Sequence, residues 1–181
     1  AAGEAFDKVG KLLGLPYPGG PHVDRLARLG RADAIDFPVA KLERGTLDVS
    51  MSGLKTAVKL FVEREPKPIS EERVRDIAAS AERAIVAALV ERLEEALDRH
   101  PSRALAISGG CACNTLLRAE AARIAAKRGI PSLVPSPPLC RDNGAMIGYA
   151  GWLSLTRGEM TPLTVNAVPN LDSFQASNPA P

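Results

Sequence analysis

The stretch that decides the fold is residues 103–134, which read RALAISGGCACNTLLRAEAARIAAKRGIPSLV. Its first five residues are mostly apolar and predict a short β-strand, and Ser108-Gly109-Gly110 predicts a turn. Residues 114–128 are rich in Ala, Leu and Ile and predict a helix, and residues 130–134 predict a second strand. Strands joined through a helix are parallel and connected by a right-handed crossover, so this stretch indicates an α/β fold.

Several helices, one of them short, are predicted before this strand–helix–strand unit. Apolar residues recur at helical spacing over residues 3–15, 23–29 and 54–62. The longest predicted helix follows Ser70, a favourable N-cap residue, and its apolar stripe runs down to Arg99.

Other segments are predicted to be less regular. Residues 16–21 hold three prolines and two glycines and predict a rigid loop, and residues 47–52 alternate apolar and polar side chains and predict an edge strand. A small-residue helix is expected from Asp142-Asn143-Gly144 to about residue 155. We expect residues 1–166 to form one lobe and residues 167–181 a flexible tail.

The composition is that of a globular protein. The chain has 181 residues, of which 45% are hydrophobic and 24% charged, and its formal net charge of +2 gives no ground for inferring a nucleic-acid partner. No apolar run approaches the ~20 residues that span a bilayer, so we expect no membrane contact. Three cysteines, an odd number, favour a reducing compartment, which we take to be the cytoplasm. The chain opens without Met or a signal sequence, so we expect a piece of a longer protein.

Candidate binding residues occur where helices begin. Gly109 and Gly110 would let a nucleotide or anion approach backbone N–H groups, although glycine also serves packing alone in such turns. Asn114 either hydrogen-bonds a ribose or base or caps its helix. Asp142 is either a helix cap or an acidic ligand or general base at the carboxyl end of a strand. Asp7, judged from its local sequence, is a solvated carboxylate that pairs with a nearby lysine.

The cysteines predict small buried thiols beside a turn. Cys111 and Cys113 form C-x-C, Cys140 is distant in sequence, and the two histidines show no metal-binding spacing. A nucleophilic cysteine would need a placed base, and no pattern identifies one.

Five motifs follow one another in the chain: AAGEAFDKV at 1–9, YPGGP at 17–21, SMSGLKT at 50–56, SGG at 108–110 with Asn114, and CRDNGAM at 140–146. In this order, over about residues 1–166, they closely resemble the C-terminal half of the TsaD/Gcp family. Its members are tRNA adenosine threonylcarbamoyltransferases, formerly described as O-sialoglycoprotein endopeptidases.

The resemblance implies an actin-like ATPase fold of the sugar kinase, Hsp70 and actin superfamily, with nucleotide bound in a cleft between two lobes. It also implies an acyltransferase that makes N6-threonylcarbamoyladenine. The threonylcarbamoyl group passes from threonylcarbamoyl-adenylate to N6 of adenosine 37 in tRNAs reading codons that begin with A. Because the N-terminal lobe is not in this chain, we expect the chain alone to be inactive or nearly so.

The resemblance assigns site residues, cofactors and partners as well. The residues assigned to the adenylate are Asp7, Gly20, Asp24, Gly109, Gly110 and Asn114. Asp142 is assigned to one divalent metal ion, Fe²⁺ in preference to Zn²⁺, alongside two histidines of the N-terminal lobe. These roles reverse the local interpretations of Asp7 and Asp142. The implied partners are tRNA, a TsaB-like paralogue and a TsaE-like ATPase.

Two other functions stay open on sequence grounds. One is a non-catalytic actin-like scaffold, and the other is a metalloprotease, for which the chain holds no zincin motif. An H-x-x-x-H motif in the missing upstream sequence would favour the transferase. Without the second lobe, apolar surface would be exposed, so we expect the isolated chain to self-associate.

Overall fold

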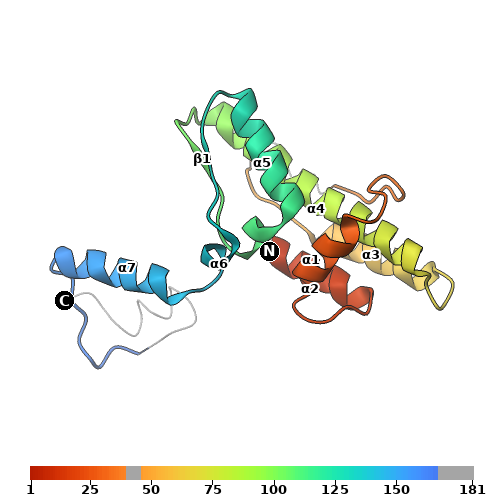
Figure 1. Cartoon of the computed structure of the whole chain (residues 1–181), viewed down its shortest axis with the longest axis horizontal. Helices are drawn as coiled ribbons and strands as arrows, with labels where there is room; N and C mark the ends of the chain where they lie inside the picture. Colours follow the sequence, from red (N-terminus) through yellow and green to blue (C-terminus); the bar gives the residue numbers. More distant parts are fainter. Residues whose placement is uncertain (40–45, 167–181) are drawn as a thin grey trace. The chain divides into compact units, whose positions relative to one another are not determined.

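The structure is a computed structural model that describes residues 1–39 and 46–166 (Figure 1). It divides the chain into two compact units, Ala1–Arg141 and Asp142–Pro181. The predicted flexible tail at residues 167–181 lies outside the described residues.

The first unit is helix-rich and has a small parallel sheet. Its elements in chain order are α1 (Ala2–Leu12), α2 (Gly19–Ala27), α3 (Ser52–Arg64), α4 (Glu71–Arg99), β1 (Leu105–Ala106), the 3₁₀ helix η1 (Gly110–Cys113), α5 (Thr115–Lys127), β2 (Ser132–Leu133) and α6 (Pro137–Cys140). The α4 helix is the centre of this unit, because α1, α2, α3 and α5 all contact it. Their apolar side chains form one core, which includes Phe6, Val58, Ile85 and Ile124.

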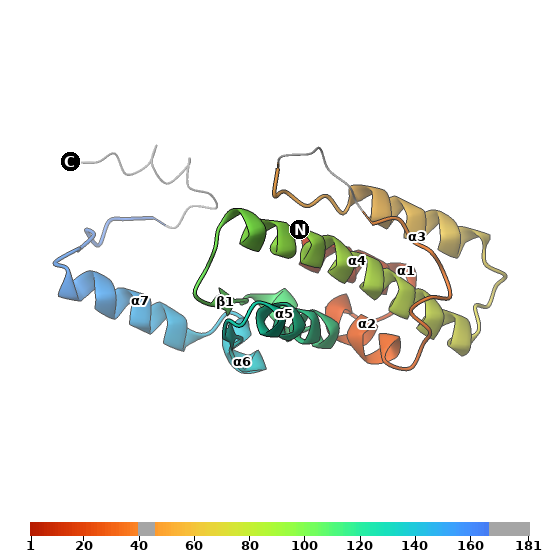
Figure 2. The same cartoon turned by 90° about the horizontal axis from the view of Figure 1, so that it is seen from above.

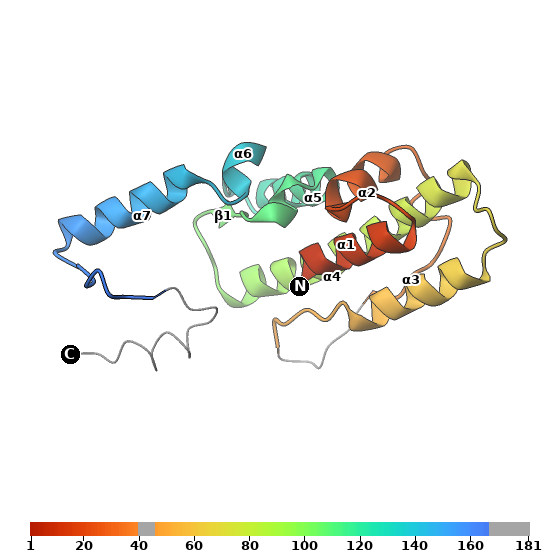
Figure 3. The same cartoon turned by 90° about the horizontal axis from the view of Figure 1, so that it is seen from below.

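As predicted, one helix, α3, ends before residues 65–70 and another, α4, begins after them, and the two form a helical hairpin (Figures 2 and 3). The Ser70 hydroxyl accepts a hydrogen bond from the Arg73 N–H and caps α4, as predicted. The Arg73 guanidinium also donates to both carboxylate oxygens of Glu65 and lies 5.0 Å from the centre of the Phe61 ring. The turn between the two helices is thus held by side chains from both of them.

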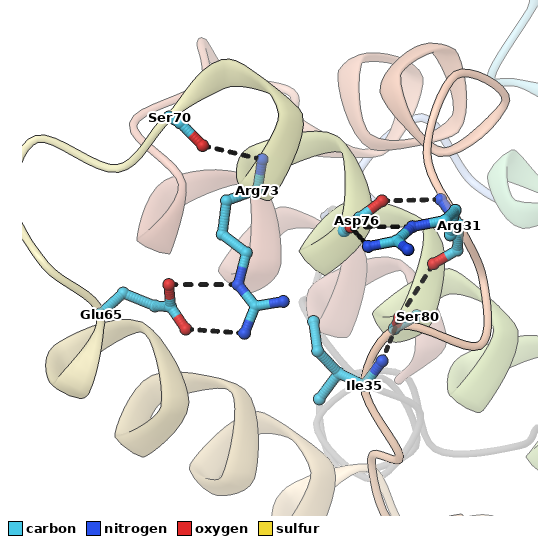
Figure 4. A network of polar contacts seen from close by, with 7 residues as sticks. All are labelled: Arg31, Ile35, Glu65, Ser70, Arg73, Asp76 and Ser80. Carbon is cyan, nitrogen blue, oxygen red and sulfur yellow. Dashed lines mark hydrogen bonds and ion pairs between the residues drawn. The ribbon is translucent and has the colours of Figure 1, made fainter.

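The segment that follows α2 is hydrogen-bonded to side chains of α4 (Figure 4). Asp76 accepts hydrogen bonds of 2.8 Å from both the backbone N–H and the guanidinium of Arg31. These bonds hold the pKa of Asp76 below its usual range. The Ser80 hydroxyl accepts from the Ile35 N–H at 3.1 Å and donates to the Arg31 carbonyl at 3.3 Å. Two side chains of α4 therefore satisfy backbone groups of a segment that has no regular structure of its own.

The rigid loop predicted at residues 16–21 is only partly correct, because α2 already begins at Gly19. Pro21 stands in the first turn of α2, where a backbone N–H has no partner inside the helix, so its missing donor is not needed. The neighbouring helix makes this early start possible, because Gly19 lies against Asp7 of α1. A Cβ on Gly19 would be only 2.9 Å from the Asp7 Cα.

The edge strand predicted at residues 47–52 is wrong. Residues 46–51 form no strand, and α3 begins at Ser52. An alternating pattern becomes a strand only where another strand offers its edge, and in the described ranges β1 and β2 pair only with each other. The apolar residues of this segment do not share one face, since Met51 is buried in the helical core and Leu47 is exposed.

The strand–helix–strand unit is confirmed as a parallel pair. Leu105 lies opposite Ser132 and Ala106 opposite Leu133, and α5 connects the two strands. Each strand has two residues, fewer than the five predicted. The described fold is therefore helix-rich with a small parallel sheet.

The second unit contains α7 (Gly144–Thr156), at the predicted position. Asn143 caps it by accepting a hydrogen bond of 3.0 Å from the Met146 N–H. No residue of α7 is buried in the described chain, and Tyr149 and Trp152 stack with ring centres 5.8 Å apart. Of the helices in residues 1–39 and 46–166, none combines the length and apolar character that crossing a membrane requires.

Candidate functional site

Asp7 of α1 caps α2 from outside that helix. Its Oδ1 accepts hydrogen bonds from the backbone N–H groups of Gly19 at 2.8 Å and Gly20 at 3.3 Å. A carboxylate in this place also interacts favourably with the positive end of the helix dipole. The expected pairing of Asp7 with a lysine is wrong, because Lys8 pairs with Glu4 at 3.3 Å. Two predicted site residues, Asp7 and Gly20, are thereby brought together.

The two glycines at the start of α2 differ in their steric surroundings. A Cβ on Gly10 of α1 would lie 2.7 Å from the Gly19 Cα, so close approach of the two backbones explains Gly19. A Cβ on Gly20 would lie 3.7 Å from the Phe6 Cβ, which is ordinary van der Waals contact. Packing among the described residues therefore does not require glycine at position 20.

Asp24 of α2 is hydrogen-bonded to the first residues of α5. Its Oδ1 accepts from the Thr115 N–H at 2.8 Å, from the Thr115 hydroxyl at 2.7 Å and from the Asn114 amide at 3.2 Å. Its other oxygen lies 3.6 Å from the guanidinium of Arg28. Asp24 is buried. Its role at α5 resembles that of Asp7 at α2, because each carboxylate accepts a backbone hydrogen bond at the N-terminus of a helix to which it does not belong.

Asn114 is the N-cap of α5. Its Oδ1 accepts from the Leu117 N–H at 2.9 Å, and its Nδ2 donates to Asp24 at 3.2 Å and to Glu82 at 2.6 Å. The capping interpretation is therefore confirmed. It leaves ligand contact open, because a carbonyl oxygen has two lone pairs and Leu117 uses one of them.

Glu82 of α4 belongs to this network, although no sequence motif pointed to it. Its side chain is buried, and burial raises the pKa of Glu82 to about 7. The charge of Asp24 raises that pKa further, whereas the hydrogen bond from Asn114 and the charge of Arg28 act against the shift. The available signal was a carboxylate within the apolar, alanine-rich run of α4, where a charged group needs a partner.

The turn at Gly109 and Gly110 is exposed and open. Gly109 has a φ of +82°, which favours glycine, and a Cβ on either residue would meet no atom within 4 Å. Next along the chain, the pKa of Cys111 is raised by burial and then by the negative charge of Asp7. A Cβ on Gly3 would lie 3.6 Å from the Cys111 Sγ, so α1, the helix that carries Asp7, lies beside this turn.

A pocket of about 260 Å³ adjoins the buried network. Its lining residues are Ala27, Arg28, Ala32, Ala79, Glu82, Thr115 and Leu116. The carboxylate of Glu82, the guanidinium of Arg28 and the hydroxyl of Thr115 thus lie among apolar lining residues, beside the network that joins Glu82 to Asn114.

Asp142 lies in the second unit and is exposed. Its interpretation as the helix cap is wrong, because Asn143 fills that role. Within the part of the chain that the structure describes, no three His, Cys, Asp or Glu side chains are placed to hold a metal ion. One carboxylate does not hold a catalytic metal ion, so these residues alone do not fit the implied metal, and Asp142 can be only one of its ligands.

The prediction of small buried thiols is only partly correct, because Cys111 and Cys113 are half-buried and Cys140 is buried. Cys140 is buried and its Sγ donates to the Pro135 carbonyl at 3.4 Å, while the half-buried Cys113 donates to Pro137 at 3.6 Å. Burial raises the pKa of Cys113, which favours the unreactive thiol form.

The first unit is therefore a helix-rich fold in which the carboxylates of Asp7 and Asp24 accept hydrogen bonds at the N-termini of α2 and α5. The sequence model of the family "TsaD: tRNA N6-adenosine threonylcarbamoyltransferase" matches residues 1–149, and the chain belongs to this family.

Several curated relatives carry the name tRNA N6-adenosine threonylcarbamoyltransferase. A protein of Clostridium perfringens is 44% identical over 171 residues, which cover 94% of this chain and 50% of that protein. One of Geobacter metallireducens is 46% identical over 170 residues, with coverages of 94% and 50%. One of Syntrophotalea carbinolica is 43% identical over 181 residues, with coverages of 100% and 53%. The chain spans about half the length of the curated relatives it matches.

Proposed function

We propose that this chain supplies one lobe of an actin-like ATPase fold to a longer protein that modifies tRNA. That protein transfers a threonylcarbamoyl group from threonylcarbamoyl-adenylate to N6 of adenosine 37 in tRNAs reading codons that begin with A. The observation that carries the proposal is the family match over residues 1–149, which includes all seven candidate site residues. The parallel β1–α5–β2 unit and the long α4 helix support the assignment of the lobe.

The proposed roles of this chain are to bind and orient the adenylate. In the transfer, N6 of adenosine bonds to the carbonyl carbon of the threonylcarbamoyl group, the bond from that carbon to the phosphate oxygen breaks, AMP leaves and N6 loses a proton. The open backbone at Gly109 and Gly110 is suited to close approach by the adenosine part. Asn114 offers the second lone pair of Oδ1, and Asp7 orients the backbone at Gly20.

Asp142 is proposed as one ligand of a divalent metal ion, Fe²⁺ in preference to Zn²⁺, with the other ligands from outside the described residues. A bound metal ion supplies Lewis-acid polarisation of an acyl-phosphate group. We further propose tRNA, a TsaB-like paralogue and a TsaE-like ATPase as partners. A cytoplasmic location is proposed because the substrate is tRNA.

The test uses the full-length enzyme with its partners, unmodified tRNA and a source of threonylcarbamoyl-adenylate, with the modified nucleoside detected by mass spectrometry. Asp142→Ala should abolish product formation and lower the bound metal, whereas Glu159→Ala, an exposed carboxylate of the same unit, should change neither. An unsubstituted enzyme that forms no product would overturn the proposed function. A fully active Asp142→Ala enzyme would remove the metal role alone. The 181-residue chain by itself is expected to form little or no product.

A further inference from the structure

Two buried carboxylates share one side-chain amide in the first unit. Nδ2 of Asn114 lies 2.6 Å from Oε1 of Glu82 and 3.2 Å from Oδ1 of Asp24. All three side chains belong to residues that are at most 9% exposed. An ionised carboxylate only accepts hydrogen bonds and an amide nitrogen only donates them, so both hydrogens of Nδ2 point at acids.

This arrangement decides which end of the Asn114 amide can meet a ligand. Oδ1 of Asn114 accepts from the Leu117 N–H. A flipped amide would set its oxygen against Asp24 and its N–H₂ group against the Leu117 N–H, and with Glu82 ionised it would break three hydrogen bonds and leave buried polar groups unpaired. Asn114 therefore presents only an acceptor, Oδ1.

Asp24 is poorly suited to hold the amide alone. Its Oδ1 already accepts two hydrogen bonds from Thr115, and its contact with Asn114 is the longer of the two. Glu82 makes the shorter contact, and within the described residues its carboxyl accepts this hydrogen bond from Asn114.

We propose that Glu82 is a positioning residue for Asn114, holding its amide so that Oδ1 accepts a hydrogen bond from the bound adenylate. The donor is an N–H of the base or an O–H of the ribose. The inference rests on the proposed function, because the family relation supplies the adenylate.

The charge of Glu82 makes this positioning testable by pH. The charged groups that face it are Asp24 and Arg28 of α2, and its pKa is raised to about 7. Both forms of the carboxyl can accept from Asn114, but the ionised form adds a second negative charge beside Asp24. We expect an anionic adenylate to bind more weakly as the pH rises through 7.

The kinetic test uses the full-length enzyme and threonylcarbamoyl-adenylate at several pH values. Glu82→Ala should raise KM for the adenylate roughly tenfold with kcat changed less than about twofold, since one buried hydrogen bond is lost. Glu82→Gln keeps the acceptor and should keep KM near the original value while abolishing its rise above pH 7. Glu91→Ala, an exposed acid of the same helix, is the matched control.

Two kinetic outcomes would overturn the proposal: an unchanged KM in Glu82→Ala, or an equal impairment in Glu82→Gln and Glu82→Ala. NMR gives a readout that needs no catalysis. The Asn114 side-chain amide resonances, in the 181-residue chain or the full-length enzyme, should titrate near pH 7 and stop doing so in Glu82→Gln. Resonances insensitive to both changes would also overturn it. Absence of transfer by the unsubstituted enzyme would refute the proposed function, and the NMR titration would still decide whether Glu82 holds Asn114.

Discussion

Asp7 on α1 accepts a 2.8 Å hydrogen bond from the backbone N–H of Gly19, the first residue of α2. The contact replaces a local cap, because Pro18, which precedes the helix, offers no capping side chain. The start of α2 is thus stabilised by a residue 12 positions earlier in the sequence. This link makes the N-terminus of α2 dependent on the packing of α1.

Removing the Asp7 carboxylate should weaken the fold. Asp7→Ala is expected to lower the free energy of unfolding by about 1 kcal/mol, the usual value of an N-cap. Asp7→Asn should lose less, because it keeps an acceptor oxygen. Urea denaturation measures both, with Asp48→Ala, an exposed aspartate, as the control. An Asp7→Ala chain as stable as the original would contradict the capping role.

Ser80→Ala should be more damaging than its size suggests. The Ser80 hydroxyl is buried and bonds the Ile35 N–H and the Arg31 carbonyl (Figure 4). Its removal leaves both backbone groups without this partner, which costs roughly 1–3 kcal/mol in the free energy of unfolding. Ser102→Ala, at an exposed serine, should change that free energy by less than about 0.5 kcal/mol. Equal effects of the two substitutions in chemical denaturation would contradict the importance of this contact.

Gly30 is expected to tolerate no side chain. A Cβ there would lie 2.2 Å from the carbonyl oxygen of Arg75 in α4, and backbone cannot move aside cheaply. Gly30→Ala should destabilise the fold by about 2 kcal/mol or more. Gly53→Ala is the matched control, because its Cβ would meet no atom within 4 Å and alanine favours a helix. Thermal melting of the two variants should therefore shift in opposite directions, and a stable Gly30→Ala chain would refute this prediction.

Stability should carry a pH dependence that comes from Glu82. Its pKa in the folded chain is about 7, above the usual 4.5, so between these values the folded state holds a proton that the unfolded state has lost. The stabilising contribution is complete below about pH 4.5 and is lost as the pH rises through 7, with an upper limit of about 3 kcal/mol. Glu82→Gln should remove this loss between pH 5 and pH 8. Groups with a lowered pKa, such as Asp76, contribute equally to the original chain and to Glu82→Gln. If the free energy of unfolding varies with pH in the same way in both chains, the prediction is contradicted.

The isolated chain should self-associate through α7. Ile147, Trp152 and Leu155 are each more than half exposed, and a cluster of large apolar side chains on a helix favours association. Light scattering should show a mass that grows with concentration, and the emission of Trp152, the single tryptophan, should shift to shorter wavelength at the same time. The double substitution Ile147→Lys and Leu155→Lys should reduce both effects. A chain that stays monomeric at high concentration would count against this role of α7.

Local features of the sequence account for much of the fold. The Ser70 cap, the length of α4 and the parallel connection of β1 to β2 were predicted, because each depends on residues that are close in sequence or on the handedness of a single crossover. The edge strand at residues 47–52 was wrong, because a strand needs a partner that no local pattern supplies.

The sequence by itself determined most of the helices, the parallel connection and the family, since ordered motifs and side-chain periodicity are properties of the linear chain. Only the tertiary structure decided which carboxylates are buried and what they hold. Asn114 bonds Asp24 from 90 positions away and Glu82 from 32 positions away. Such contacts arise from the packing of α2 and α5 on α4, and burial then changes the pKa of Glu82, which no local propensity predicts.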